Sequence, residues 1–69
     1  MKFKNLRAEL ARNQISIAEV CRVLGVSRGT VFGKFAGRTD WRLTEVKQIV
    51  ELIHERSGKR YSVEYLFGI

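Results

Sequence analysis

Apolar residues recur along this chain at the three- and four-residue intervals of helices rather than in the alternation of strands. Leu6 and Leu10 lie one turn apart, and the longest run starts at Leu43 and continues at offsets of 3, 6, 7 and 10 residues. The pattern predicts no sheet other than a short pairing near residues 59–61. It predicts five helices, at residues 5–13, 17–24, 28–36, 43–56 and 63–67.

The inner faces of these helices predict the core of one compact all-α domain. The expected core residues are Leu6, Leu10, Val20, Leu24, Val31, Phe35, Val46, Ile49, Val50, Ile53 and Leu66. Asn5 is placed to cap the first helix, and Trp41, in the loop after the third, is expected to fill the core. His54 has no partner at metal-ligand spacing, so we expect it in solvent.

The most specific local pattern covers residues 16–37. Ser16 and Glu19 have the spacing of a capping box, in which each side chain bonds a free N–H of the first helical turn. Gly25 is suited to end that helix in the left-handed conformation. Ser27 is then placed to cap a second helix. Two short helices joined by a tight turn with a glycine form a helix-turn-helix unit.

This segment resembles the DNA-binding domain of phage Cro and repressor proteins, the Cro/repressor-like (XRE) helix-turn-helix family. The likeness rests on the capping box, the turn Gly25-Val26-Ser27, the pair Thr30-Val31 and the terminal Gly37. It extends more loosely from Leu6 to Phe67. The resemblance implies one compact five-helix domain over residues 1–69, acting as a transcriptional regulator that binds operator DNA, with a homodimer as the expected form.

The positive charge is concentrated in the part of the chain that carries this motif. The net charge is +6, and residues 1–42 hold nine Lys and Arg against three Asp and Glu. Residues 43–69 hold four of each and are neutral. A one-sided basic field is typical of a protein that binds a polyanion such as double-stranded DNA.

Other classes of function lack their characteristic residues. The single cysteine leaves no internal disulfide and no Cys-rich metal site. No Ser/His/Asp, Cys/His or paired-carboxylate arrangement is discernible, so we expect no enzyme and no cofactor. No apolar run approaches the ~18 residues of a membrane span. The expected location is the cytoplasm of a bacterial host, in association with the nucleoid.

In helix-turn-helix proteins the second helix of the motif lies in the major groove. The outward positions expected to meet bases are Arg28, Gly29, Thr30, Phe32 and Gly33. Arg28 can donate two hydrogen bonds to guanine O6 and N7, and Phe32 can rest on a thymine methyl. Thr30 either meets the DNA or caps the helix by local backbone bonding.

Phosphate contacts are expected around both helix starts and in the loop after the motif, where such residues fix register without reading sequence. The candidates are Ser16, Ile17, Ser27, Lys34, Arg38, Thr39 and Arg42. Relatives often have a phosphate-contacting glutamine in place of Ile17. Backbone N–H groups at that helix start can still bind an anion.

Two glycines inside the expected recognition helix leave two interpretations open. Gly29 and Gly33 each cost about 1 kcal/mol relative to alanine. In the first interpretation they let the backbone approach the groove. In the second, base readout has weakened, and exposed Phe32 serves a protein-interaction module such as an antirepressor or a modulator of another regulator.

The dimer interface is expected in the C-terminal region because the family often dimerises there. The candidates lie between Glu55 and Tyr61, together with the last helix. They are Arg56, Lys59 and Tyr61.

Overall fold

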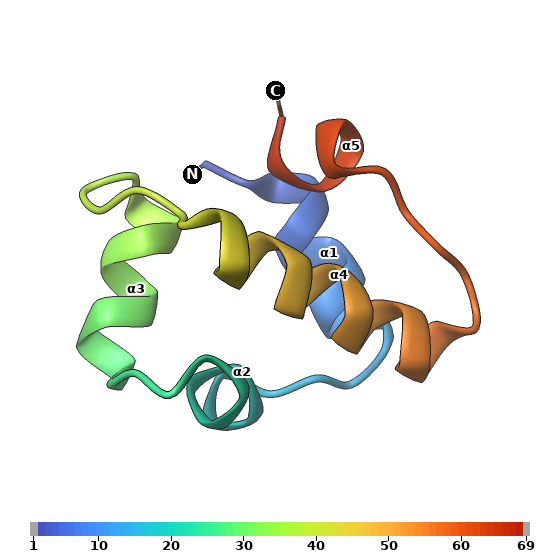
Figure 1. The fold of residues 1–69 in the computed structure, drawn as a ribbon, viewed down its shortest axis with the longest axis horizontal. Coiled ribbons are helices and arrows are strands. Elements are labelled where there is room, and N and C mark those ends of the chain that lie inside the picture. The colour runs from blue at the N-terminus through green and yellow to red at the C-terminus, as the bar shows by residue number, and fades with distance from the viewer. Residues whose placement is uncertain (1, 69) are drawn as a thin grey trace.

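The computed structural model describes residues 2–68 and contains five helices arranged as a compact globule (Figure 1). They are α1 (Lys4–Arg12), α2 (Ile17–Leu24), α3 (Arg28–Ala36), α4 (Leu43–Ser57) and α5 (Val63–Phe67). No strand occurs within residues 2–68, so the all-α class is confirmed and the short pairing near 59–61 is wrong. Each predicted helix is present, with ends shifted by one residue at most.

Serine caps and left-handed glycines set the helix boundaries. The hydroxyls of Ser16, Ser27 and Ser62 accept hydrogen bonds from the N–H three residues further on, at 3.1, 3.3 and 3.0 Å. Each cap satisfies a backbone donor that the first turn of a helix leaves free. Gly25 and Gly37 end α2 and α3 with φ values of 71° and 82°. These are conformations in which a Cβ would be strained.

The start of α1 differs from the prediction. Phe3, with φ 59° and ψ 44°, precedes the helix, and α1 begins at Lys4. Asn5 therefore lies inside the first turn and caps nothing. Its side-chain amide donates instead to the carbonyl of Tyr65, at 2.9 Å, which joins α1 to α5.

The core lies where α4, the long helix across the middle of Figure 1, packs among the other helices. Leu24, Val46 and Val50, which the sequence placed inside, are only half-buried and pack at its edge. In α4 the buried face runs through Ile49, Leu52 and Ile53, so Val46 and Val50 lie to one side of it. The buried apolar residues are Leu6, Leu10, Ile15, Val20, Val31, Phe35, Ile49, Leu52, Ile53, Leu66 and Phe67.

Trp41 is the centre of an aromatic cluster, as predicted for a core-filling residue. Its ring centroid lies 5.5 Å from that of Phe35, 5.2 Å from that of Phe67 and 6.0 Å from that of Phe3, all edge to face. These arrangements match the positive ring edge to the negative ring face. The cluster thereby joins the loop after α3 to the chain start and to α5.

His54 lies in α4, and its ring is half-buried rather than in solvent. Its Nδ1 is buried and has no hydrogen-bond partner among the described residues. The surface assignment was wrong because His54 follows the fully buried Ile53 and shares a helix face with half-buried Val50.

Candidate nucleic-acid interface

The segment expected to form the motif folds as two helices around a short turn. The carbonyl of Cys21, in the last turn of α2, accepts from the N–H of Gly25 at 2.8 Å and from that of Val26 at 3.1 Å. Val26 packs against the core, and Ser27 begins α3. Both helices are capped, and α2 packs directly on α3, so the turn fixes the direction of α3 relative to α2.

Three of the expected base-contacting residues lie on the open side of α3. Arg28 is exposed in the first turn, and Phe32, one turn later, keeps 45% of its surface exposed. Gly29 is exposed too, and a Cβ added there would meet no atom within 4 Å. These three positions give a surface with one cation, one aromatic ring and a stretch of bare backbone.

Thr30 is half-buried and is engaged within the helix start. Its N–H donates to the Ser27 hydroxyl, and the two side-chain oxygens lie 3.0 Å apart. In this pairing one of the two hydroxyls donates to the other. Ser27 is therefore the cap of α3, and the Thr30 hydroxyl contacts the Ser27 hydroxyl instead of the backbone.

Gly33 is buried and faces the loop after α3, so its assignment to the outward side is wrong. Its carbonyl accepts from the N–H of Arg38 at 2.9 Å and from that of Thr39 at 3.3 Å. A Cβ added at Gly33 would lie 3.4 Å from the Thr39 hydroxyl oxygen. Gly33 thus faces the loop and not an external surface.

Lys34 also turns inward, which corrects its assignment as a phosphate contact. Its side chain is 3% exposed, and Nζ lies 2.8 Å from Oε1 of Glu45 in α4. Nζ also donates to the carbonyl of Asp40 at 3.0 Å and lies 5.8 Å from the ring centroid of Trp41. Lys34 therefore belongs to the interior, and the sequence analysis missed Glu45 as its partner.

The buried pair holds the Glu45 carboxyl ionised. Burial raises the pKa of Glu45, but the hydrogen bonds from Lys34 and from the Arg42 N–H, with both nearby positive charges, outweigh it. The net effect is a pKa below the ordinary value of 4.5. A carboxylate that receives charged and backbone donors at once is stabilised in its ionised form.

Three of the remaining phosphate candidates lie in the α3–α4 loop, residues 37–42. Arg38, Thr39 and Arg42 are exposed. Within residues 2–68 neither Arg38 nor Arg42 forms an ion pair, and the same holds for Arg28. These guanidinium groups are therefore available to an external anion.

The other phosphate candidates lie at the starts of α2 and α3. Ser16 and Ser27 are exposed, but each hydroxyl already accepts a backbone N–H. Ile17 is half-buried and packs at the edge of the core, so it offers only its backbone to a ligand.

The expected dimer residues are partly engaged within the chain. Arg56 of α4 forms an ion pair with Glu19 of α2. Tyr61 is half-buried and stacks on Tyr65, with ring centroids 5.6 Å apart and planes inclined by 22°. Lys59 is exposed. Of the three side chains, that of Lys59 takes part in neither the ion pair nor the ring stacking.

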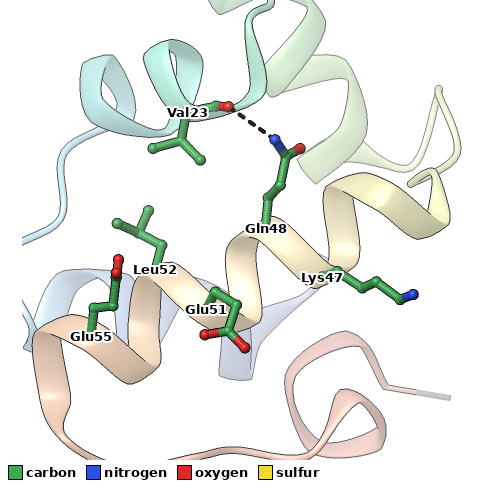
Figure 2. A pocket seen from close by; sticks show the side chains of 6 residues that line it. All are labelled: Val23, Lys47, Gln48, Glu51, Leu52 and Glu55. Atoms are coloured by element: carbon green, nitrogen blue, oxygen red, sulfur yellow. Dashed lines mark hydrogen bonds between the residues drawn. The ribbon is translucent and has the colours of Figure 1, made fainter.

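A separate groove of about 330 Å³ lies between α2 and α4 (Figure 2). Val23 and Leu52 form its apolar wall, and the amide of Gln48 donates to the Val23 carbonyl at 3.3 Å across it. Glu51 and Glu55 lie along its rim. Lys47 also lines the groove, so its charged side chains are two carboxylates and one ammonium group, and it has no excess of positive charge.

No protein-family model, curated protein or solved structure matches this chain. In the part of the chain that the structure describes, no helix has the length and apolar character needed to cross a membrane. The same residues hold no group of three or more His, Cys, Asp or Glu side chains able to bind a metal ion.

Proposed function

We propose that this protein binds double-stranded DNA through α3 and regulates transcription in the manner of phage Cro and repressor proteins. The observation that carries the proposal is Arg28, an exposed cation with no ion pair among residues 2–68. It stands on the first turn of a serine-capped helix that follows a tight glycine turn. Recognition helices of this class insert their N-terminal residues into the major groove.

In this proposal the exposed residues of α3 read the bases. Arg28 donates both arms of its guanidinium to one guanine, and Phe32 contacts a thymine methyl. The bare backbone at Gly29 lets α3 lie deep in the groove. Direct readout by a bidentate Arg–guanine pair contributes about 1–3 kcal/mol of discrimination against another base.

The α3–α4 loop supplies the contacts that fix register. Arg38, Thr39 and Arg42 are exposed beside the end of α3, where the DNA backbone passes in this binding mode. Phosphate contacts of this kind strengthen binding to any sequence and make it depend on salt.

We further propose that two copies bind together. One α3 reaches one half-site, and two-fold operators match a protein dimer with half-sites about 34 Å apart. The C-terminal region remains the candidate interface, where Lys59 is exposed and forms no ion pair among residues 2–68. A complex of one protein per palindromic duplex, measured by sedimentation, would contradict this part of the proposal.

A protein-interaction module is the second candidate, and the exposure of Phe32 favours it. An aromatic ring that is 45% exposed beside the bare Gly29 backbone is suited to an apolar protein groove as well as to DNA. Such a module would modify another regulator instead of reading an operator.

Selection of binding sites from a pool of random duplexes tests the proposal. We expect enrichment of a two-fold symmetric site that shifts in a gel at low salt and loses its shift when scrambled. Absence of any sequence preference, with recovery of a protein partner that requires Phe32, would support the second candidate.

A further inference from the structure

The interior pair of Lys34 and Glu45 is bonded to the backbone of the α3–α4 loop at two points. Lys34 Nζ donates to the Asp40 carbonyl at 3.0 Å. Glu45 Oε1 accepts from the Arg42 N–H at 2.9 Å as well as from Lys34 at 2.8 Å. Both bonds lie in the second half of the loop, on either side of Trp41.

The first half of the loop is fixed separately, by α3 itself. The Gly33 carbonyl accepts from the N–H groups of Arg38 and Thr39, and the Lys34 carbonyl accepts from that of Gly37. These bonds extend from the end of the helix and reach no further than Thr39. Arg42 is held beyond that point: Trp41 before it packs in the aromatic cluster, its carbonyl accepts from the N–H of Val46 at 2.9 Å, and Glu45 is the acceptor of its N–H.

Burying an ion pair in this part of the interior carries a desolvation cost. The two side chains are 3% and 9% exposed, so both charges have left water. Replacing a buried pair by apolar residues of similar size is often neutral or stabilising. Apolar side chains cannot, however, donate to Asp40 or accept from Arg42. What the pair adds beyond packing is thus a defined loop backbone.

We propose that Lys34 and Glu45 are positioning residues, which hold the α3–α4 loop so that Arg38 and Arg42 meet the DNA backbone together. The pair touches no DNA itself. This inference rests on the proposed function for the DNA-binding consequence, whereas the ordering of the loop is testable without DNA.

The test uses the double variant Lys34→Met/Glu45→Met, which keeps side-chain length and apolar packing. Circular dichroism first confirms the helical fold. Amide hydrogen exchange in the absence of DNA is then expected to be about tenfold faster at Arg42 than in the wild type, because that N–H no longer has its acceptor. Amides of α2 are expected to keep their protection. Unchanged exchange at Arg42 would overturn the inference.

DNA binding of the same variant gives the second measurement. Affinity is expected to fall on selected and scrambled duplexes alike. The log–log salt slope should become shallower by about one unit for each phosphate that the displaced loop no longer neutralises. Wild-type affinity and slope in the double variant would show that the loop needs no such positioning.

Swapping the charges of Lys34 and Glu45 tests whether the pair acts through its hydrogen bonds to the loop or only through the attraction between opposite charges. Lys34→Glu/Glu45→Lys keeps opposite charges together but faces a carboxylate to the Asp40 carbonyl and an ammonium to the Arg42 N–H. We expect fast exchange at Arg42 and weak DNA binding, as in the double methionine variant. Full recovery of both properties would overturn the inference, because attraction alone would then suffice.

A matched control removes an ion pair at the surface. Arg60 and Glu51 are 3.0 Å apart with side chains more than half exposed. Arg60→Gln/Glu51→Gln is expected to leave hydrogen exchange at Arg42 in the absence of DNA unchanged, and equal acceleration from both pairs would count against a specific role for Lys34 and Glu45.

If the interior variants do not fold, amide hydrogen exchange of the wild-type protein tests the inference. An Arg42 amide as fast as that of an unstructured peptide would overturn the inference. Failure of wild-type protein to prefer any duplex would refute the proposed function, while the exchange results would still report on the loop.

Discussion

The hydroxyl of Tyr65 in α5 donates a 2.9 Å hydrogen bond to Oε2 of Glu9 in α1. Glu9 is 1% exposed and also accepts from Arg12 at 2.9 Å, while its second oxygen is buried without a partner among the described residues. A buried carboxylate with so few donors depends strongly on each of them. The last helix, only five residues long, is therefore tied to the first by a polar contact as well as by apolar packing.

The first prediction concerns alkaline pH. The hydrogen bond to Glu9, followed by burial and the Glu9 charge, raises the pKa of Tyr65 above its ordinary value of 10.0. A raised folded-state pKa contributes stability that is complete below pH 10 and is lost as pH rises through the folded pKa. Tyr65→Phe should lower Tm at pH 7 and show a smaller further loss between pH 9 and 11 than the wild type, measured by thermal melts. Parallel curves for the two proteins would contradict this account.

The second prediction tests the core. Leu6 is fully buried, so Leu6→Ala should reduce the free energy of unfolding by about 2–5 kcal/mol. Leu43 is the same residue type but 70% exposed. Leu43→Ala should change stability by no more than about 0.5 kcal/mol. Urea unfolding of both variants provides the comparison, and similar losses would show that the buried face of α1 is misassigned.

The third prediction distinguishes stability from function at Gly29. Because an added Cβ meets nothing within 4 Å, Gly29→Ala should stabilise α3 by about 0.5–1 kcal/mol. If α3 must approach the groove closely, the same variant should bind the selected duplex more weakly. Denaturant unfolding and a DNA titration measure the two effects. A variant that is more stable and binds equally well would mean that Gly29 has no part in close approach.

The fourth prediction separates reading from positioning. Arg28→Ala should cost about 1–3 kcal/mol on the selected site and relax preference at one base pair. Arg38→Ala, which removes the same charge from the loop, should weaken selected and scrambled duplexes alike. It should also flatten the salt slope by about one unit for each phosphate that Arg38 neutralises in the wild type. Titrations of both variants at several salt concentrations are required. If the two variants lose the same affinity on both duplexes, Arg28 contributes only its positive charge and reads no base.

The helices could be predicted from sequence because their boundary residues act locally. A serine hydroxyl bonds an N–H three residues away, and glycine alone enters the left-handed conformation freely, so Ser27 and Gly37 define α3 without help from the rest of the chain. Asn5 was misassigned because its actual partner is the backbone of Tyr65, 60 residues away in the chain. No local pattern contains such a contact.

The sequence analysis did not predict that Lys34 and Glu45 are buried, although the pattern of neighbouring apolar residues indicates it. Lys34 stands three residues after Val31 and one before Phe35, which puts all three on one face of α3. Glu45 precedes Ile49 by one turn in the same way. A charged residue on an apolar face is ordinarily solvated, and only the folded structure shows that these two residues meet. Their pairing removed Lys34 from the expected phosphate contacts.

The packing of Phe3 against Phe67, with ring centroids 6.2 Å apart, has a consequence for the rate of folding. Contacts between α2 and α3 join residues close in sequence, whereas joining α1 to α5 closes almost the whole chain. Long loops cost more entropy to close, so this closure is expected after the transition state. Substitutions in α5 should then accelerate unfolding and leave the refolding rate nearly unchanged. Trp41, the single tryptophan of the chain, lies against both rings, and its fluorescence reports this final step directly.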